Sequence, residues 1–342
     1  MKKFFVLSFI VVFSVYLLQA QECLAPVKSK KQWGFINKSG TFVAQFQYAQ
    51  AWQFSEGLAS VRTNKLYGYI NNKGERVIPE GFIRAEKFSE GLARVRPDDK
   101  KNDKWGYIDK TGHFVIPSQF KRAQNFSEGV AAVRTNVLWG YIDQYGKWLI
   151  KPKYEGAEPF HDGLARVKVD ELVGFINQNG EMVIEPQFDN ARDFSEGLAR
   201  VKVDEDWGFI DKTGALVIPA TFKNVGDFSE GLACVKSDGN WGYINKQGEW
   251  IIEPTIQKVS GMAEWSNDRY ASEFMIAATS PEKQWGFMNH FGKLIIPYQW
   301  VKVEPFHCGL AAVYNGNLWG FIDKTGKIVI PYQFDKIRSF SK

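Results

Sequence analysis

The sequence predicts an all-β repeat protein built from nine units of about 34 residues, each with three short antiparallel strands. Three observations support this prediction. A Trp-Gly pair returns at a nearly constant interval, a second phrase of the form FSEGLA runs in step with it, and 31 Gly and 13 Pro residues punctuate the chain. Self-similarity at such a period indicates units that bury a core only by stacking on their neighbours.

The Trp-Gly pair sets the period of the chain. Successive pairs are 34 residues apart, except for one interval of 38 and one of 44. These two exceptions place a four-residue insertion near 97–104 and a ten-residue insertion within 262–280. The first residue of each pair is Trp or a replacement: Trp33, Tyr67, Trp105, Trp139, Val173, Trp207, Trp241, Trp285 and Trp319.

Three phrases of the unit together resemble a known family. These are WG[YF]I[ND]xxG, a strand ending of the VIP type, and FSEGLA, which residues 262–279 do not retain. They are similar to those of the bacterial WG-repeat family, also called KWG repeats, and the resemblance covers residues 21–342, which we interpret as one domain. It implies a β-rich, usually exported protein, and it supplies no catalytic residue and no cofactor.

The first two strands of each unit are expected to form a tight hairpin. In the unit that begins at Trp105, two β-prone runs flank the turn Asp109-Lys-Thr-Gly. All nine units have Asn or Asp at the first turn position and Gly three residues later. This spacing predicts a type I turn held by the Asx side chain and closed by a left-handed Gly. Asn at several of these positions argues against a calcium site, and we predict no metal.

The third strand, GLAxV, predicts contacts on both faces of each sheet. Ala93 and Val95 point to one face, and Leu92 and Arg94 point to the other. Both faces therefore carry apolar groups, as expected for stacked units. We predict that the tryptophans of the repeat are core, because a buried indole removes about 150–250 Å² from water. Val173 can fill a core but could not continue a row of ligand-stacking rings.

The first residues of the repeat array correspond to the part of a unit that the last residues lack. Residues 23–27 align with the GLAxV strand, and residues 340–342 stop where that strand should begin. The first strand could therefore complete the last unit and close a ring, as in propellers. Closure of this propeller-like kind is favoured, and an open β-superhelix or solenoid is the alternative.

The first residues have the pattern of a secretory signal peptide. Lys2 and Lys3 precede an apolar run at 4–18, followed by a small-residue cleavage site near Ala20. We expect residues 1–20 to be removed and the mature monomer to be exported to the periplasm, cell surface or medium. A lipid anchor is not expected at Cys23, because it follows Glu22 rather than a small residue. We expect no membrane span in the mature chain, and three cysteines allow at most one disulfide.

Ligand-binding residues are sought where units differ from one another. One candidate is a basic stripe that could follow an anionic polymer, although nearby acidic residues favour paired charges. With a formal net charge of +5 for the full sequence, nucleic acid is not expected as a partner. The stripe also includes Arg62, Arg134 and Lys236, and its candidate binding residues are Arg94, Arg96, Arg166, Lys168, Arg200 and Lys202.

Two further candidates are tryptophans outside the repeat position and the ten-residue insertion. An exposed indole at Trp52 or Trp300 would suit a sugar or a peptide. A single elaborated loop on a regular scaffold is a usual place for a specific site. Its candidate residues are Trp265, Asp268, Arg269, Tyr270 and Glu273.

Catalysis is the least supported class. The four histidines lie in different units, and the chain has no metal-spaced pair, nucleophile elbow or phosphate-binding loop. We therefore predict a non-catalytic binding or scaffolding module, without cofactor, for a protein or glycan ligand at the cell envelope or outside the cell. The alternatives are a glycan-active enzyme that uses the 262–280 loop and a binder of an anionic polymer through the basic stripe.

Overall fold

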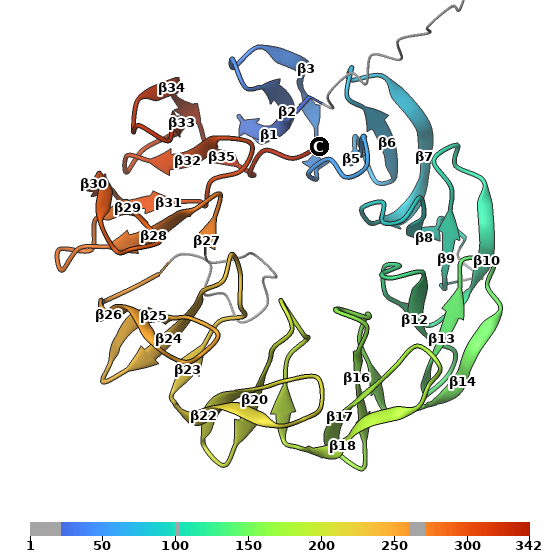
Figure 1. Ribbon diagram of the computed structural model, residues 1–342. Coiled ribbons are helices and arrows are strands. Elements are labelled where there is room, and N and C mark those ends of the chain that lie inside the picture. Colours follow the sequence, from blue (N-terminus) through green and yellow to red (C-terminus); the bar gives the residue numbers. More distant parts are fainter. Residues whose placement is uncertain (1–21, 100–102, 260–270) are drawn as a thin grey trace, which may run out of the picture.

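The computed structural model describes residues 22–99, 103–259 and 271–342, and every regular element in these ranges is a β-strand. The strands form small antiparallel sheets that follow one another around a ring (Figure 1). Eight hydrogen-bonded sheets contain nine units, because the long strand β7 (Arg76–Ala85) belongs to two of them. We number the units as sheets 1 to 9 in chain order. The all-β prediction with nine repeats is confirmed.

Each sheet has four strands, which we take from the inside of the ring outward. The innermost strands have two residues: β4 (Gln50–Ala51), β11 (Arg122–Ala123), β15 (Gly156–Ala157), β19 (Asn190–Ala191), β23 (Asn224–Val225), β27 (Ala271–Ser272), β31 (Lys302–Val303) and β35 (Lys336–Ile337), with the end of β7 in sheet 3. The second strands are β1 (Leu24–Ser29), β5 (Leu58–Arg62), β8 (Ala93–Pro97), β12 (Val130–Arg134), β16 (Ala165–Val169), β20 (Ala199–Val203), β24 (Ala233–Ser237), β28 (Met275–Thr279) and β32 (Leu310–Tyr314).

The outer half of each sheet is the hairpin that the Trp-Gly phrase predicts. Its inner members are β2 (Gln32–Asn37), β6 (Tyr67–Asn71), β9 (Trp105–Ile108), β13 (Trp139–Asp143), β17 (Leu172–Ile176), β21 (Asp206–Ile210), β25 (Asn240–Ile244), β29 (Trp285–Asn289) and β33 (Trp319–Asp323). Its outer members are β3 (Phe42–Tyr48), β7, β10 (Phe114–Phe120), β14 (Trp148–Tyr154), β18 (Met182–Phe188), β22 (Leu216–Phe222), β26 (Trp250–Ile256), β30 (Leu294–Trp300) and β34 (Ile328–Phe334).

The two-residue strands add a fourth strand to the three that the sequence predicts. In sheet 4, Arg122 pairs with Arg134 and Ala123 with Val133. Two residues are too few to show the alternation that identifies a strand in a sequence. The extra strand places the residues that follow it at the inner side of the ring.

The hairpin turns have the predicted chemistry. The Asp109 carboxylate accepts hydrogen bonds from the backbone N–H groups of Thr111 and His113, at 2.9 and 3.0 Å, and Gly112 has a φ of +90°. Hydrogen bonding to the Thr111 hydroxyl is the main cause that lowers the pKa of Asp109. The conserved geometry of the turn explains the Asx and Gly positions without a ligand.

The glycine of the Trp-Gly pair allows the outer strand to approach closely. A Cβ on Gly106 would lie 2.7 Å from the carbonyl oxygen of Ile116. The pairing register shifts there, because Tyr107 opposes Ile116 whereas Trp105 opposes Phe120. The outer strand therefore contains a bulge, and in sheet 3 this bulge includes Pro117.

Nine apolar clusters hold neighbouring sheets together, one at each boundary between sheets. Between sheets 4 and 5, Trp139 and Tyr141 pack against Ala165 and Val167. Val173 packs in the corresponding cluster of the next boundary. The prediction that both faces of each sheet are apolar, with repeat tryptophans between units, is confirmed.

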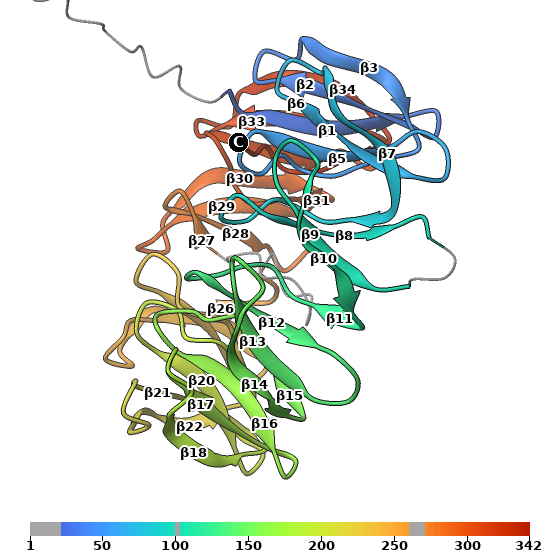
Figure 2. The ribbon, with the colours of Figure 1, turned by 90° about the vertical axis from the view of Figure 1, so that its right-hand side faces the viewer.

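Strand β1 closes the ring, as the phase of the ends predicts. It pairs with β2 and also with β35, where Val27 opposes Ile337. The backbone N–H of Leu24 donates to the carbonyl of Ser341 at 2.9 Å. Figure 2 shows the first and last strands (blue and red) side by side. These contacts correspond to the closed, propeller-like form rather than the open superhelix.

A repeated carboxylate links the inner turn of one sheet to the next sheet at most boundaries, and we call this contact the clasp. In sheet 6 the Glu196 carboxylate accepts hydrogen bonds from the backbone N–H groups of Gly231 and Glu230, at 3.0 and 2.7 Å, and lies 3.3 Å from the Lys246 ammonium. The same contact recurs at seven boundaries: Glu56 to Gly91, Glu90 to Gly129, Glu128 to Gly163, Asp162 to Gly197, Glu196 to Gly231, Glu230 to Phe274 and Glu273 to Gly309.

At the boundary between sheets 9 and 1 a disulfide takes the place of the clasp. Cys308 occupies the glutamate position of its turn and shares the positive φ of those glutamates, +57° against +54° for Glu196. Cys23 precedes Leu24 just as five of the six clasp glycines precede leucine, and Gly129 precedes Val130. The two cysteines are bonded across 285 residues of chain. The one disulfide that three cysteines allow thus joins the two ends of the ring, and Cys234 is free and buried.

The inner turn of sheet 8 corrects one reading of the sequence. The FSEGLA phrase looks lost at residues 262–279, but Glu273 and Phe274 occupy its Glu and Gly positions, with φ values of +54° and +62°. Phe274 replaces the glycine, which hides the phrase in the sequence. Glu273, a candidate ligand-binding residue, is therefore the clasp of sheet 8 and also pairs with Lys324 at 3.1 Å.

Candidate functional site

The inner side of the ring carries positions at which the units differ from one another. Between each two-residue strand and the following Phe of the FSEG turn lie two residues that change in size and charge from unit to unit. The first of these positions, which we call the inner position, is occupied by Arg338, Trp52, Glu86, Gln124, Glu158, Arg192, Gly226 and Glu304 in sheets 1 to 7 and 9. The equivalent residue of sheet 8 lies outside the described ranges. Side chains that select a ligand are expected at such positions.

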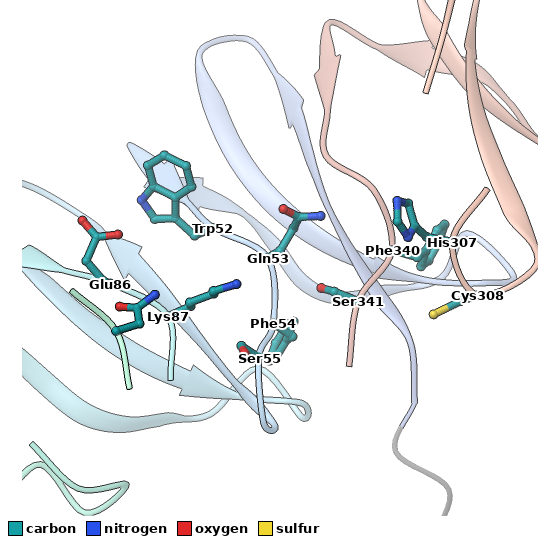
Figure 3. Close-up of a pocket in the computed structure, with 11 residues that line it drawn as sticks. Trp52, Gln53, Phe54, Ser55, Glu86, Lys87, His307, Cys308, Phe340 and Ser341 are labelled. Atoms are coloured by element: carbon teal, nitrogen blue, oxygen red, sulfur yellow. The ribbon is translucent and has the colours of Figure 1, made fainter. Parts of the chain in front are cut away.

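A pocket of about 500 Å³ opens among these residues, which we call the inner pocket (Figure 3). This volume is within the usual range for small-ligand sites. Its lining comes from the inner turns of sheets 9, 1, 2, 3 and 4, which the ring brings together although they lie at opposite ends of the chain. The lining residues are Trp52, Gln53, Phe54, Ser55, Glu86, Lys87, Asn125, His307, Cys308, Phe340 and Ser341.

Trp52 provides a fixed aromatic surface in the inner pocket. Its side chain is 44% exposed, the largest exposure of any tryptophan in the described ranges. The Arg338 guanidinium lies 3.9 Å from the Trp52 ring centroid and 5.3 Å from that of Trp33. Arg338 also donates to the carbonyl of Ala51 at 3.1 Å, and its burial lowers the pKa of the guanidinium. These contacts hold the indole in place from one side.

Polar side chains surround the indole. Gln53 donates from Nε2 to the carbonyl of Ser339 at 3.2 Å, which leaves its amide oxygen available. Glu86 is half exposed, with an oxygen 4.0 Å from Nη2 of Arg94, and Lys87 is exposed. The Oδ1 atom of Asn125 is buried and has no hydrogen-bond partner in the described chain. The inner pocket therefore offers both donors and acceptors and carries charges of both signs.

Polar side chains at and next to the inner positions of sheets 4 to 6 pair with one another instead. Gln124 donates to the Glu158 carboxylate at 3.3 Å, and Arg166 pairs with Asp193 at 2.5 Å. Burial raises the pKa of Glu158, opposed in part by Arg166. This side of the ring is occupied by its own charge network, so the inner pocket is the better candidate site.

Six residues of the predicted basic stripe are ion-paired, whereas Arg62, Arg134 and Lys236 lie over the rings of Tyr67, Trp139 and Trp241. Arg94, Arg166 and Arg200 are largely buried and donate to backbone carbonyls of the next sheet: Ala123, Ala191 and Val225 respectively. Each also lies near a carboxylate. Arg200 is 2.7 Å from Asp227. The other three members lie nearer the surface, and their partners are Asp103 for Arg96, Glu171 for Lys168 and Glu205 for Lys202. These pairs leave no row of free cations along the six residues.

The two tryptophan candidates lie in different environments, one in a pocket and one in the core. Trp52 lines the inner pocket, whereas Trp300 is only 3% exposed and packs in the cluster between sheets 8 and 9. Trp300 is therefore not a binding surface. It ends an outer strand and directly opposes Trp285, and its indole N–H donates to the Tyr332 hydroxyl at 2.9 Å. Of the insertion candidates, Trp265, Asp268, Arg269 and Tyr270 lie outside the described residues.

Sequence reasoning missed most of the inner pocket. Gln53, Glu86, Lys87, Asn125 and Arg338 were not candidates, because none belongs to a motif. A signal was present, since these residues fall in the two positions before the Phe-Ser turn, where no single residue type is common to all units. Aligning the units by their differences, instead of by their common phrases, would have identified them.

The described part of the chain contains neither a metal-binding cluster nor a membrane-spanning helix. Within residues 22–99, 103–259 and 271–342, no three His, Cys, Asp or Glu side chains gather closely enough to hold a metal ion. Over the same residues, no helix has the length and apolar character needed to cross a membrane.

Comparisons with known proteins identify the repeat and the fold. A family model described as "WG containing repeat" matches nine segments: 33–67, 67–100, 105–136, 139–172, 174–205, 207–241, 241–264, 285–319 and 319–342. Among solved structures, the crystal structure of a eukaryotic initiation factor is similar, with a TM-score of 0.64 and 10% sequence identity over 94% of this chain and 98% of that chain. BamB from Moraxella catarrhalis matches with a TM-score of 0.41 and 10% identity over 78% and 93% of the two chains. No curated protein sequence matches the chain.

Proposed function

The chain belongs to the family of WG-containing repeats, and we propose that this member is an exported, non-catalytic binding module that takes its ligand at the inner pocket. The observation that carries the proposal is the contrast between the repeated and the variable residues. The repeated residues fill the cores between sheets, the turns and the clasps, whereas residues of the variable pairs of sheets 2, 3 and 4 line the inner pocket. A scaffold with a variable inner surface is suited to recognition.

The non-catalytic part of the proposal is supported by the chemistry of the inner pocket. Glu86 is the single carboxylic acid among its lining residues, whereas glycoside hydrolysis ordinarily needs two carboxyl groups that flank the bond. The insertion was the alternative location for such an enzyme. Its residue Glu273 is engaged in the clasp with Gly309 and Lys324, so it is a poor candidate for acid–base chemistry.

The export part of the proposal is supported by two features. Residues 1–20 have the pattern of a signal peptide. The disulfide between Cys23 and Cys308 is of a kind that persists in oxidising compartments and is rare in the cytosol. Cell fractionation with N-terminal sequencing checks this part. We expect a mature chain that begins near residue 21 outside the cytoplasm, and an uncleaved cytoplasmic chain would contradict it.

The binding part is tested by capture on the immobilised mature chain. Envelope and culture-medium fractions are applied to the wild type, to the pocket variant Trp52→Ala/Lys87→Ala, and to the control variant Arg192→Ala. Arg192 has the same inner position in sheet 6, away from the inner pocket.

We expect a component that the wild type and the control variant retain and the pocket variant releases. Equal retention by all three proteins would place binding elsewhere and overturn the proposal. The retained component is then incubated with the wild type in solution, and its consumption would show an enzyme instead of a binding module.

A further inference from the structure

We infer that the inner pocket recognises a neutral saccharide, one ring of which stacks on the open face of Trp52. This inference rests on the proposed function, because it names the class of ligand for the same site. It is argued from the shape of the apolar surface, the surrounding polar groups and the balance of charge.

The indole of Trp52 is a rigid platform with one open face. Arg338 covers one side at 3.9 Å and is itself held by the carbonyl of Ala51 and by the ring of Trp33. A platform fixed in advance loses little conformational freedom when a ligand stacks on it. Figure 3 shows Trp52 standing at the edge of the pocket, opposite the residues from sheets 9 and 1.

The apolar surface of the inner pocket is flat and not enclosing. The other two aromatic lining residues, Phe54 and Phe340, are 4% and 2% exposed, and both pack into clusters between sheets. A hydrophobic peptide side chain binds best in a pocket that surrounds it. A sugar ring instead presents one face of C–H groups, with hydroxyl groups around its edge, and requires a single flat apolar partner.

The polar groups around the platform suit those hydroxyl groups. Gln53 and Asn125 contribute amides, Glu86 contributes an acceptor and Lys87 a donor. Amide and carboxylate groups can each hydrogen-bond to two neighbouring hydroxyl groups.

The charge of the inner pocket favours a neutral ligand over an anionic one. Glu86 and Lys87 are adjacent and opposite in sign. The guanidinium of Arg338, which could attract an anion, is covered by two indole rings and bonded to a carbonyl. An acidic glycan or a nucleic acid would find no net positive surface here, and its binding would weaken strongly with salt.

The test uses a panel of neutral oligosaccharides built on glucose, galactose, mannose and N-acetylglucosamine. Binding to the mature chain is measured by isothermal titration calorimetry at about 50 and about 500 mM salt. The variants are Trp52→Ala, Trp52→Phe and Gln53→Ala, with Arg192→Ala as the matched control at the same position of sheet 6. Melting temperatures of all variants establish that each is folded.

We expect at least one oligosaccharide to bind with an affinity that changes little with salt. Trp52→Ala should weaken it by about tenfold or more, through the loss of stacking, and Trp52→Phe should retain part of the affinity. Arg192→Ala should bind like the wild type.

Two outcomes overturn the inference and are distinguishable. If no neutral oligosaccharide binds while a captured protein or anionic glycan depends on Trp52 and Lys87, the ligand class is wrong but the binding site stands. If an oligosaccharide binds but is unaffected by the Trp52 and Gln53 variants, the saccharide lies outside the inner pocket and this assignment fails.

Discussion

Removal of the Cys23–Cys308 disulfide is expected to lower the stability of the ring substantially. The change is made by reducing the Cys234→Ala protein with a phosphine, so that the only sulfur affected is in the disulfide. In the chain-entropy description, a cross-link across 285 residues restricts the unfolded state by about 5.6 kcal/mol at 25 °C. This is an upper value, because real unfolded chains are compact and sample fewer conformations.

The expected change in melting temperature follows from the size of the protein. A chain of this length has an unfolding entropy of about 0.7 kcal/mol/K, so the full effect corresponds to about 8 °C. The folded ring loses little on reduction, because β1 still pairs with β35 and the cluster between sheets 9 and 1 remains. We therefore expect the reduced protein to be folded at room temperature and to melt several degrees lower.

The assay is calorimetry of the oxidised and reduced forms, together with hydrogen exchange of the closing strands. Reduction should accelerate exchange in β1 and β35 more than in equivalent strands such as β16 and β15, since only the first pair lies at the disulfide boundary. Identical melting temperatures and unchanged exchange in β1 would refute the reasoning that the disulfide constrains the ring.

Three further predictions concern the clasp, the hairpin turns and the free thiol. Glu196→Ala should lower the free energy of unfolding in urea by about 1–3 kcal/mol, because the backbone N–H of Gly231 loses its partner. Glu196→Gln should lower it less, because the amide oxygen can still accept this hydrogen bond. Equal losses for the two variants would contradict this role of Glu196. Hydrogen bonding to Thr213 lowers the pKa of Asp211 in the folded protein. The ionised Asp211 carboxylate therefore stabilises the fold fully above the unfolded-state pKa of about 4, and this stabilisation is lost as the pH falls through the lower pKa of the folded state. Asn keeps an acceptor oxygen for the turn, as Asn245 does, and it does not titrate. Asp211→Asn should melt close to the wild type at pH 7 and lose less stability on acidification, and an unchanged acid response would count against this role. Burial raises the pKa of the Cys234 thiol to about 12. Iodoacetamide at pH 8 should therefore label this thiol only in denaturant, as measured by mass spectrometry. Rapid labelling of the native protein would disprove its burial.

Much of the fold follows from patterns that operate within one unit. The alternation in the GLAxV strand predicted that Ala93 and Leu92 face opposite neighbours, and they pack in the clusters on the two sides of sheet 3. The Asx and Gly spacing predicted the turns, because an Asn or Asp side chain and a left-handed glycine determine that geometry locally. The phase of the ends predicted closure by β1.

Contacts between units were harder to predict, because they depend on the angle at which sheets meet. The repeated Glu of FSEG has its partner outside its own unit, because it accepts a hydrogen bond from the glycine of the next turn. Cys308 replaces that Glu and Cys23 replaces that Gly, so knowledge of the clasp would have selected this pair among the three possible ones. The inner pocket depends on the same geometry, since it joins Trp52 to His307 across the closed ring.

The bulge in each outer strand also determines how one ring meets another. An edge strand with a straight run of free N–H and carbonyl groups can recruit a foreign strand and start a fibre. In eight of the nine sheets the outer strand instead carries a proline, as at Pro117, which removes one N–H donor at this perimeter. Strand β3 has Gln45 at that place. If these rings ever join edge to edge, β3 is where the first intermolecular ladder should form.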